Sequence, residues 1–143
     1  MTTARDLDTA LETIKTSLAA QLPHRVVGRS LLLDPMAADE ADLRKGVICI
    51  VNGGGGKWAN YLGREGQLGQ ANTSVVAFVL VDEDSAPVDV ERAELALLDD
   101  VLGWVHNPGL PRPVNSVLPL EFRQSGQLEH PFGCMVLTLN VKP

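Results

Sequence analysis

The chain has 143 residues and a formal net charge of −6, a length that suits one domain with a real core. The acidic balance argues against a duplex-binding surface, which normally carries a basic patch. No apolar run approaches the roughly 20 residues that a membrane helix needs. We therefore expect a single domain over residues 1–143, made in the cytosol, with no signal peptide and no membrane partner.

The first 46 residues predict a helix, a strand and a short third element. Residues 3–22 are expected to form a helix, because apolar residues recur there at spacings of four, three and four. These residues are Leu7, Leu11, Ile14 and Leu18. Residues 24–33 are typical of a strand, with Gly28 as a bulge or bend. Asp34 can cap a short helix that ends near Gly46, and a loop is the alternative.

Two Val-rich runs, residues 47–51 and 74–81, are the clearest strands. Between them lie 22 residues, of which seven are glycine. A loop of that length is unusual in a compact domain, and it indicates a function or an order that depends on a partner.

The second half predicts a broad amphipathic helix over residues 88–106, packed closely on a sheet. Residues 117–123 are expected to form a strand in which Pro119 marks an edge or a bulge. In residues 132–141 apolar side chains alternate, which favours a sheet with one buried face. The expected fold is therefore α+β: a mostly antiparallel sheet of about five strands, two main helices packed on it, and a long glycine-rich loop.

The glycine run after residue 51 is compatible with a phosphate-binding loop only at first sight. A Walker motif, G-x-x-x-x-G-K-[ST], would align its last glycine and lysine with Gly56 and Lys57. Its first glycine would then be Val51 and its hydroxyl residue would be Trp58. The dinucleotide pattern G-x-G-x-x-G fails at Trp58 as well. The sequence therefore favours a flexible turn over a nucleotide site.

Other catalytic or metal-binding patterns are missing from the sequence. The three histidines lie at the ends of predicted elements, and none has the spacing of a metal-ligand pair or a nucleophile–base pair. Cys49 and Cys134 each lie in an apolar strand and are expected to be buried, reduced thiols. The acidic stretch 82–100 is interpreted as a solvated turn and helix face. We expect no catalytic residue, no metal and no cofactor, and hence no enzyme.

Two polar stretches supply candidate contact residues. Trp58 and Tyr61 either fold back on their own domain or anchor a partner, where such residues are enriched. A second polar turn, residues 123–129, is similar in character, and a solvated turn is the slightly favoured interpretation there. The candidate interface residues are Trp58, Tyr61, Arg64, Glu65, Gln67, Arg123, Gln124, Gln127 and Glu129.

The full-length order of elements resembles the tail terminator, or tail completion, proteins of long-tailed bacteriophages. The resemblance rests on the N-terminal helix, the long loop 53–73, the apolar helix 90–105 and the closing pair that contains residues 122–129 and 134–141. The stretches Arg64-Glu65-Gly66-Gln67-Leu68-Gly69 and Gln127-Leu128-Glu129-His130-Pro131 are also similar to minor tail proteins. No shared chemical motif transfers a residue role.

The resemblance implies a structural virion protein, assembled in the host cytoplasm. Such proteins form a ring, commonly of six subunits, on the end of the tail tube. They bind the tail tube protein, stop tube growth and present a surface to the head–tail connector or neck, and genomic DNA passes through without specific binding. The alternatives are another head–tail connector or minor tail subunit, or a small cytosolic ligand-binding domain that uses the glycine-rich loop.

Overall fold

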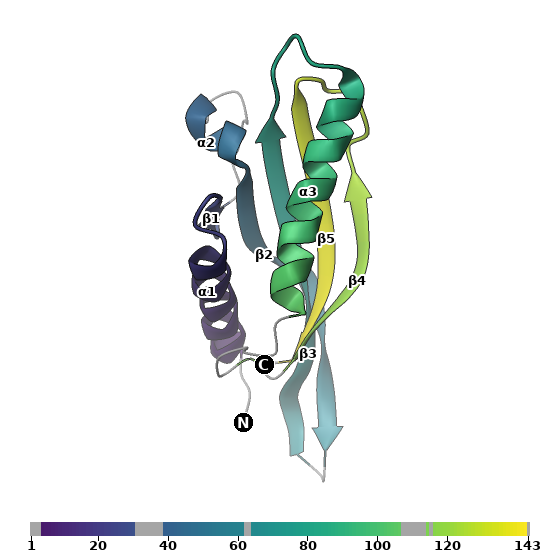
Figure 1. The fold of residues 1–143 in the computed structure, drawn as a ribbon. Helices are drawn as coiled ribbons and strands as arrows, with labels where there is room; N and C mark the ends of the chain where they lie inside the picture. Colours follow the sequence, from purple (N-terminus) through teal and green to yellow (C-terminus); the bar gives the residue numbers. More distant parts are fainter. Residues whose placement is uncertain (1–3, 31–38, 62–63, 107–113, 115, 143) are drawn as a thin grey trace.

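The computed structural model describes residues 4–30, 39–61, 64–106, 114 and 116–142, with the backbone alone at residues 4, 58–61 and 64–68. A five-stranded sheet carries helices on its faces (Figure 1). The elements in chain order are α1 (Ala4–Gln21), β1 (Val26–Gly28), α2 (Glu40–Lys45), β2 (Val47–Tyr61), β3 (Arg64–Leu80), α3 (Pro87–Val105), β4 (Ser116–Gln124) and β5 (Phe132–Lys142).

The sheet has the strand order β1-β2-β3-β5-β4 and is mixed, not mostly antiparallel as the sequence suggested. β1 pairs in parallel with β2, with Val26 opposite Val47. Parallel neighbours need a crossover connection, and this one contains α2. α2 starts after Asp39, whose carboxylate accepts a hydrogen bond from the Ala41 N–H. The cap predicted at Asp34 lies outside the described residues.

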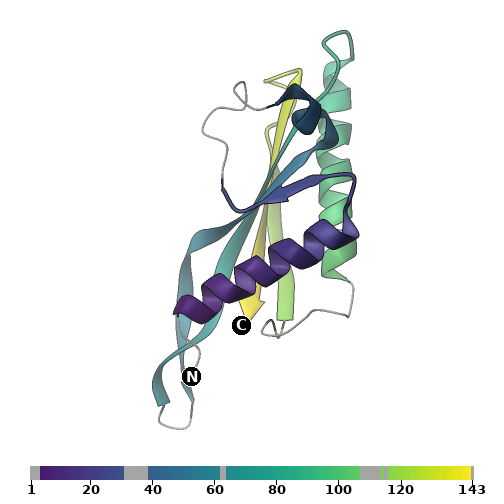
Figure 2. The ribbon, with the colours of Figure 1, turned by 90° about the vertical axis from the view of Figure 1, so that its left-hand side faces the viewer.

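α1 and α3 cover one face of the sheet, and both match the predicted apolar stripes. Leu11, Ile14 and Leu18 of α1 are buried in the main core. α3 begins with Pro87 at its first turn, a position where the missing N–H costs nothing. Trp104 of α3 is buried and donates its indole N–H to the Ser17 hydroxyl of α1 at 2.9 Å. Figure 2 shows α3 running along the sheet and α1 crossing the strands at an angle.

β5 confirms the predicted alternation. Its odd-numbered residues 133–141 are buried under the helices, and its even-numbered residues 132–140 are half-buried on the other face. It pairs antiparallel with β3 from Ala71–Val141 to Leu80–Phe132. β4 pairs with the other side of β5 and has an irregularity between Pro119 and Glu121. Pro119 therefore lies both in an edge strand and at a bulge, as its chemistry requires.

The second face of the sheet carries a smaller core under α2. Leu43 packs there with Val47, Cys49 and Leu80. Cys49 is buried, whereas Cys134, further along the same face, is half-buried. The expectation of buried thiols therefore holds fully for one cysteine and in part for the other.

The thiol environments predict a loss of stability in alkali. Burial raises the pKa of Cys49, and burial followed by the charges of Glu94 and Glu129 raises the pKa of Cys134, both from an ordinary value of 9.0. Above that pH the unfolded chain releases its thiol protons first, so the free energy of unfolding falls as the pH rises. Urea unfolding from neutral pH upwards would measure the slope. The double variant Cys49→Ala/Cys134→Ala should show a shallower slope, and identical slopes would refute the assignment.

The long glycine-rich loop of the sequence-based prediction is not present. β2 and β3 continue through it, so that strands of 15 and 17 residues form one long hairpin. Glycine normally disfavours strands because it lacks a side chain to pack. Here Gly53 and Gly56 allow the two backbones to approach each other closely.

Candidate functional site

The end of the β2–β3 hairpin projects beyond the rest of the sheet. β5 pairs with β3 only from Ala71 onwards, and the preceding pair, Gln70 with Lys57, has no third strand beside it among the described residues. We call this two-stranded part, residues 57–61 and 64–70, the ribbon. Figure 1 shows it extending past the ends of β4 and β5.

Glycines at the base of the ribbon let its strands meet. A Cβ on Gly53 would lie 2.7 Å from the Asn72 carbonyl oxygen, and a Cβ on Gly56 would lie 2.7 Å from the Gln70 carbonyl oxygen. The pairing shifts between Asn52 and Gly55, and inside this irregularity Gly54 has a φ of 86°. Such irregularities bend and twist a strand pair. The glycine run thus sets the direction in which the ribbon leaves the sheet.

Three matched substitutions test this role of the glycines. Gly53→Ala and Gly56→Ala should each destabilise the protein by about 1–3 kcal/mol, because the new methyl group must displace backbone atoms. Gly55→Ala is the control, since its Cβ would meet nothing within 4 Å. Its stability should stay within about 0.5 kcal/mol of the wild type. Thermal unfolding of the three variants measures the difference, and equal melting temperatures would contradict the close approach.

The first group of predicted interface residues lies on the ribbon. Trp58 and Tyr61 are on β2, and Arg64, Glu65 and Gln67 are on β3. In the backbone register, Tyr61 is opposite Arg64 and Gln67 is opposite Ala59. Strand pairing therefore brings residues from both sides of the predicted loop onto one short structure. The orientations of these side chains lie outside what the structure describes.

The second group of predicted residues lies at the opposite end of the sheet. Arg123 and Gln124 are on β4, and Gln127 and Glu129 are in the turn that leads to β5. That turn adjoins the Leu80 end of β3, whereas the ribbon begins at its Arg64 end. The structure therefore separates the two groups. Arg123, Gln127 and Glu129 are exposed.

Gln124 belongs to a buried polar network centred on Glu94, a residue of the acidic stretch that the sequence predicts to be a solvated turn and helix face. Glu94 is 0% exposed. Its carboxylate accepts hydrogen bonds from the Cys134 N–H at 2.7 Å, the Ser125 hydroxyl at 2.5 Å and the Gln124 amide at 3.2 Å. Three donors satisfy a buried carboxylate and tie α3 to the β4–β5 turn.

A sequence signal for Glu94 does exist. It stands four residues after Val90 and three before Leu97, in the middle of the apolar stripe of α3. A charged residue at such a position is buried when the helix packs on a sheet, and it then needs partners. Its contacts give it a structural role, because they join α3 to the β4–β5 turn.

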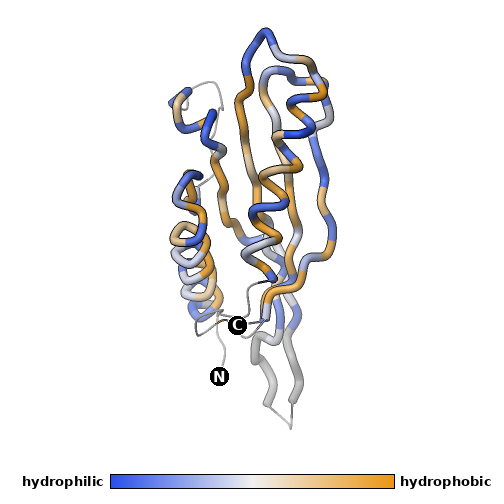
Figure 3. Tube along the Cα trace, in the orientation of Figure 1, coloured by the Kyte–Doolittle hydropathy of each residue, from blue (hydrophilic) through white to orange (hydrophobic). Residues whose placement is uncertain are grey.

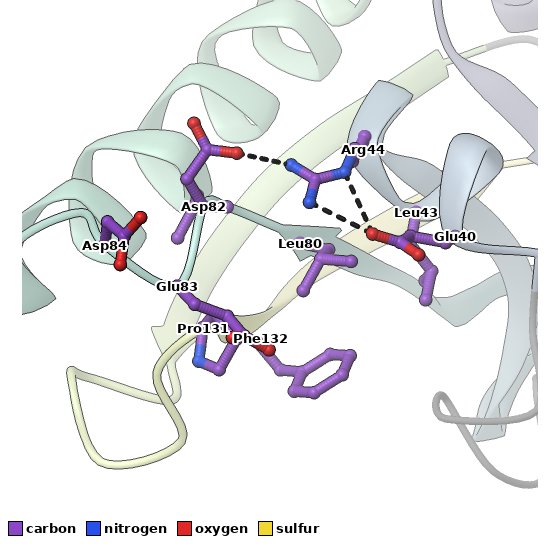
Figure 4. Close-up of a pocket in the computed structure, with 10 residues that line it drawn as sticks. Glu40, Leu43, Arg44, Leu80, Asp82, Glu83, Asp84, Pro131 and Phe132 are labelled. Atoms are coloured by element: carbon purple, nitrogen blue, oxygen red, sulfur yellow. Dashed lines mark hydrogen bonds and ion pairs between the residues drawn. The ribbon is translucent and has the colours of Figure 1, made fainter.

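A cleft of about 810 Å³ lies near the same end of the sheet (Figure 4). Arg44 bridges the carboxylates of Glu40 at 3.0 Å and Asp82 at 2.7 Å. These two contacts, that with Glu40 first, raise the pKa of Arg44. Glu83 and Asp84 add further negative charge, and Leu43, Leu80 and Phe132 supply apolar lining. The cleft is therefore acidic, because its one described guanidinium, that of Arg44, is already paired with two carboxylates.

A serine and a histidine distant in sequence meet beside this cleft. The Nε2 of His130 lies 3.1 Å from the Ser85 hydroxyl oxygen. The hydroxyl donates its only proton to the Asp82 carbonyl oxygen, so His130 must act as the donor. This is the reverse of the direction in which a general base activates a nucleophile, and the pair braces the turn before α3.

The described residues contain neither a metal-binding cluster nor a membrane-spanning helix. No three histidine, cysteine or acidic side chains gather there in a way that could hold a metal ion. None of the helices in the described ranges has the length and apolar character needed to span a membrane.

No model of a known protein family matches the chain, and no curated protein matches it either.

Proposed function

We propose that this protein is a structural subunit of a phage virion, a tail terminator that caps the tail tube as an oligomeric ring. The observation that carries the proposal is the ribbon. A two-stranded hairpin is marginally stable alone in water, so a ribbon that leaves its sheet is a structure suited to completion by another surface. The order of elements resembles that of the tail terminator family. From this resemblance we infer that the other surface belongs to a neighbouring subunit or to the tail tube.

In this proposal the ribbon of each subunit contacts the neighbouring subunit or the tube. A ring built this way uses two different faces of each subunit, and it closes when the rotation between neighbours is right. The ribbon sequence holds Trp58, Tyr61 and Arg64, the residue types that dominate binding energy at interfaces. The described part of the ribbon therefore has both the shape and the composition of a contact arm.

The proposed partners are further copies of the chain, the tail tube protein and the head–tail connector. DNA passes through the ring during genome delivery. The net charge of −6 favours this passage, because like charges repel and a DNA channel should not retain its cargo. The mechanism is binding and geometry, without bond chemistry.

A tube-growth assay tests the function. A phage tail tube protein is polymerised with and without the purified protein, and tube lengths are measured by negative-stain electron microscopy. We expect tubes that stop growing and carry a ring at one end. Unchanged growth, together with thermal stabilisation by a nucleotide, would replace this proposal with the ligand-binding alternative.

A further inference from the structure

The outer edge of β4 is open and apolar. β4 is the last strand in the sheet order, so among the described strands none pairs with its outer side. Leu118, Leu120 and Phe122 are 53%, 57% and 48% exposed. A groove of about 290 Å³ runs between this strand and α3, lined by Leu98 and Leu102 from the helix. Figure 3 shows hydrophobic colour recurring along β4. Long apolar edges of this kind associate unless something covers them.

The backbone of β4 is prepared for a further strand over its C-terminal half. Pro119 and the bulge interrupt the edge on the N-terminal side, and the pairing with β5 is regular from Glu121 to Gln124. The Ser125 N–H donates to the Cys134 carbonyl oxygen at 2.9 Å, which sets the alternation of the ladder. Residues 121 and 123 therefore direct their backbone groups towards β5, and residues 122 and 124 direct theirs outwards.

The charges on β4 identify what pairs with this edge. Glu121 and Arg123 stand two residues apart and lie opposite Thr138 and Val136, on the face away from α3. If a second copy of β4 lies antiparallel with Phe122 opposite Phe122, each Glu121 faces Arg123 of the second copy. The strand is thus complementary to itself, with an aromatic pair at the centre and opposite charges on both sides.

We propose that two copies of this chain associate through β4, antiparallel and two-fold about Phe122, to form one continuous sheet. The outward N–H and C=O groups of the two Phe122 residues pair with each other. Leu120 of each copy lies diagonally beside Phe122 of the other, which covers these two apolar side chains. A register centred on Leu120 would overlap more residues, but it places Glu121 opposite Pro119, which offers neither a charge nor an N–H.

The pairing does not use the ribbon and stands independently of the proposed function. A ring that turns one face to the tube and another to the head has no two-fold axis in its plane. If the proposed function holds, the pair is therefore a form of the free protein that separates before assembly.

Charge exchange tests the register. Glu121→Arg and Arg123→Glu each place like charges opposite one another at two symmetric positions, which should weaken self-association about tenfold relative to the wild type. An equimolar mixture of the two variants should recover wild-type affinity as a heterodimer. Analytical ultracentrifugation measures the dissociation constants, and circular dichroism checks that each variant is folded.

Two exposed substitutions away from β4, Asp84→Arg and Lys45→Glu, control for the change of net charge and should leave the dissociation constant unchanged. A monomeric wild type would overturn the proposal, as would variants that self-associate like the wild type or fail to recover on mixing. None of these outcomes depends on tube binding, so failure of the tail-terminator function would remain distinguishable.

Discussion

Replacing Glu94 by alanine is expected to destabilise the protein by about 3 kcal/mol, which lowers the melting temperature by roughly 10 °C. The carboxylate is fully buried and accepts from the Cys134 N–H, the Ser125 hydroxyl and the Gln124 amide. Without it, the half-buried donors of the β4–β5 turn lose their acceptor, and each such loss costs more than an average hydrogen bond contributes. Thermal and urea unfolding measure the effect.

Glu94→Gln is the matched control for this prediction. Its amide oxygen can still accept from the Cys134 N–H, while its amide nitrogen can only donate. We expect a smaller loss than with alanine. Arg92→Ala, in the same helix, removes an exposed ion pair with Asp89 and should change the stability by less than about 1 kcal/mol. If Glu94→Ala lowered the free energy of unfolding no more than Arg92→Ala does, the hydrogen-bond network around Glu94 would not stabilise the fold.

Removing the ribbon is expected to abolish assembly and leave the fold intact. Residues 58–69 can be replaced by Asn-Gly, which joins Lys57 to Gln70, a pair in register, through a two-residue hairpin turn. The buried Ala71 and the pairing of β3 with β5 are retained. The melting temperature should therefore stay close to that of the wild type, whereas ring formation and tube capping should be lost.

A variant that keeps the full length of the ribbon tests whether its aromatic side chains make the contact with the tube. The double variant Trp58→Ala/Tyr61→Ala keeps the backbone and removes the two aromatic side chains. It should weaken tube capping at least tenfold if they are the anchors. Intact capping by this variant would show that Trp58 and Tyr61 are not the anchors.

Much of the fold is readable from periodicity. The stripe Leu11, Ile14 and Leu18 places α1 on the sheet, and the alternation around Leu137 and Leu139 assigns one buried face to β5. These patterns are local, because each helix or strand shows its own face in its own sequence. The parallel pairing of β1 with β2 is not local. It depends on Val26 meeting Val47 across a crossover, and three residues of strand carry too little pattern to show it.

The glycine-rich segment was predicted wrongly for a physical reason. Glycine usually marks turns, and seven of them between two strands indicated a loop. Gly53 and Gly56 instead remove side chains that would strike the opposite backbone. A glycine that is needed because a neighbouring strand lies close looks the same in the sequence as a glycine that is needed for a turn. The prediction of a solvated face was also wrong for Glu94, which is buried. The acidic residues around it indicated a solvated helix face, although Glu94 itself lies in the apolar stripe of α3.

In the proposed function, the ribbon attaches this protein to the end of a tail tube. The most direct test is electron microscopy of tubes mixed with wild-type protein or with the variant in which Asn-Gly replaces residues 58–69. We predict ring-capped tubes of limited length with the wild type, and uncapped, growing tubes with the variant, although both proteins are folded. Tubes capped equally by both proteins would contradict attachment through the ribbon.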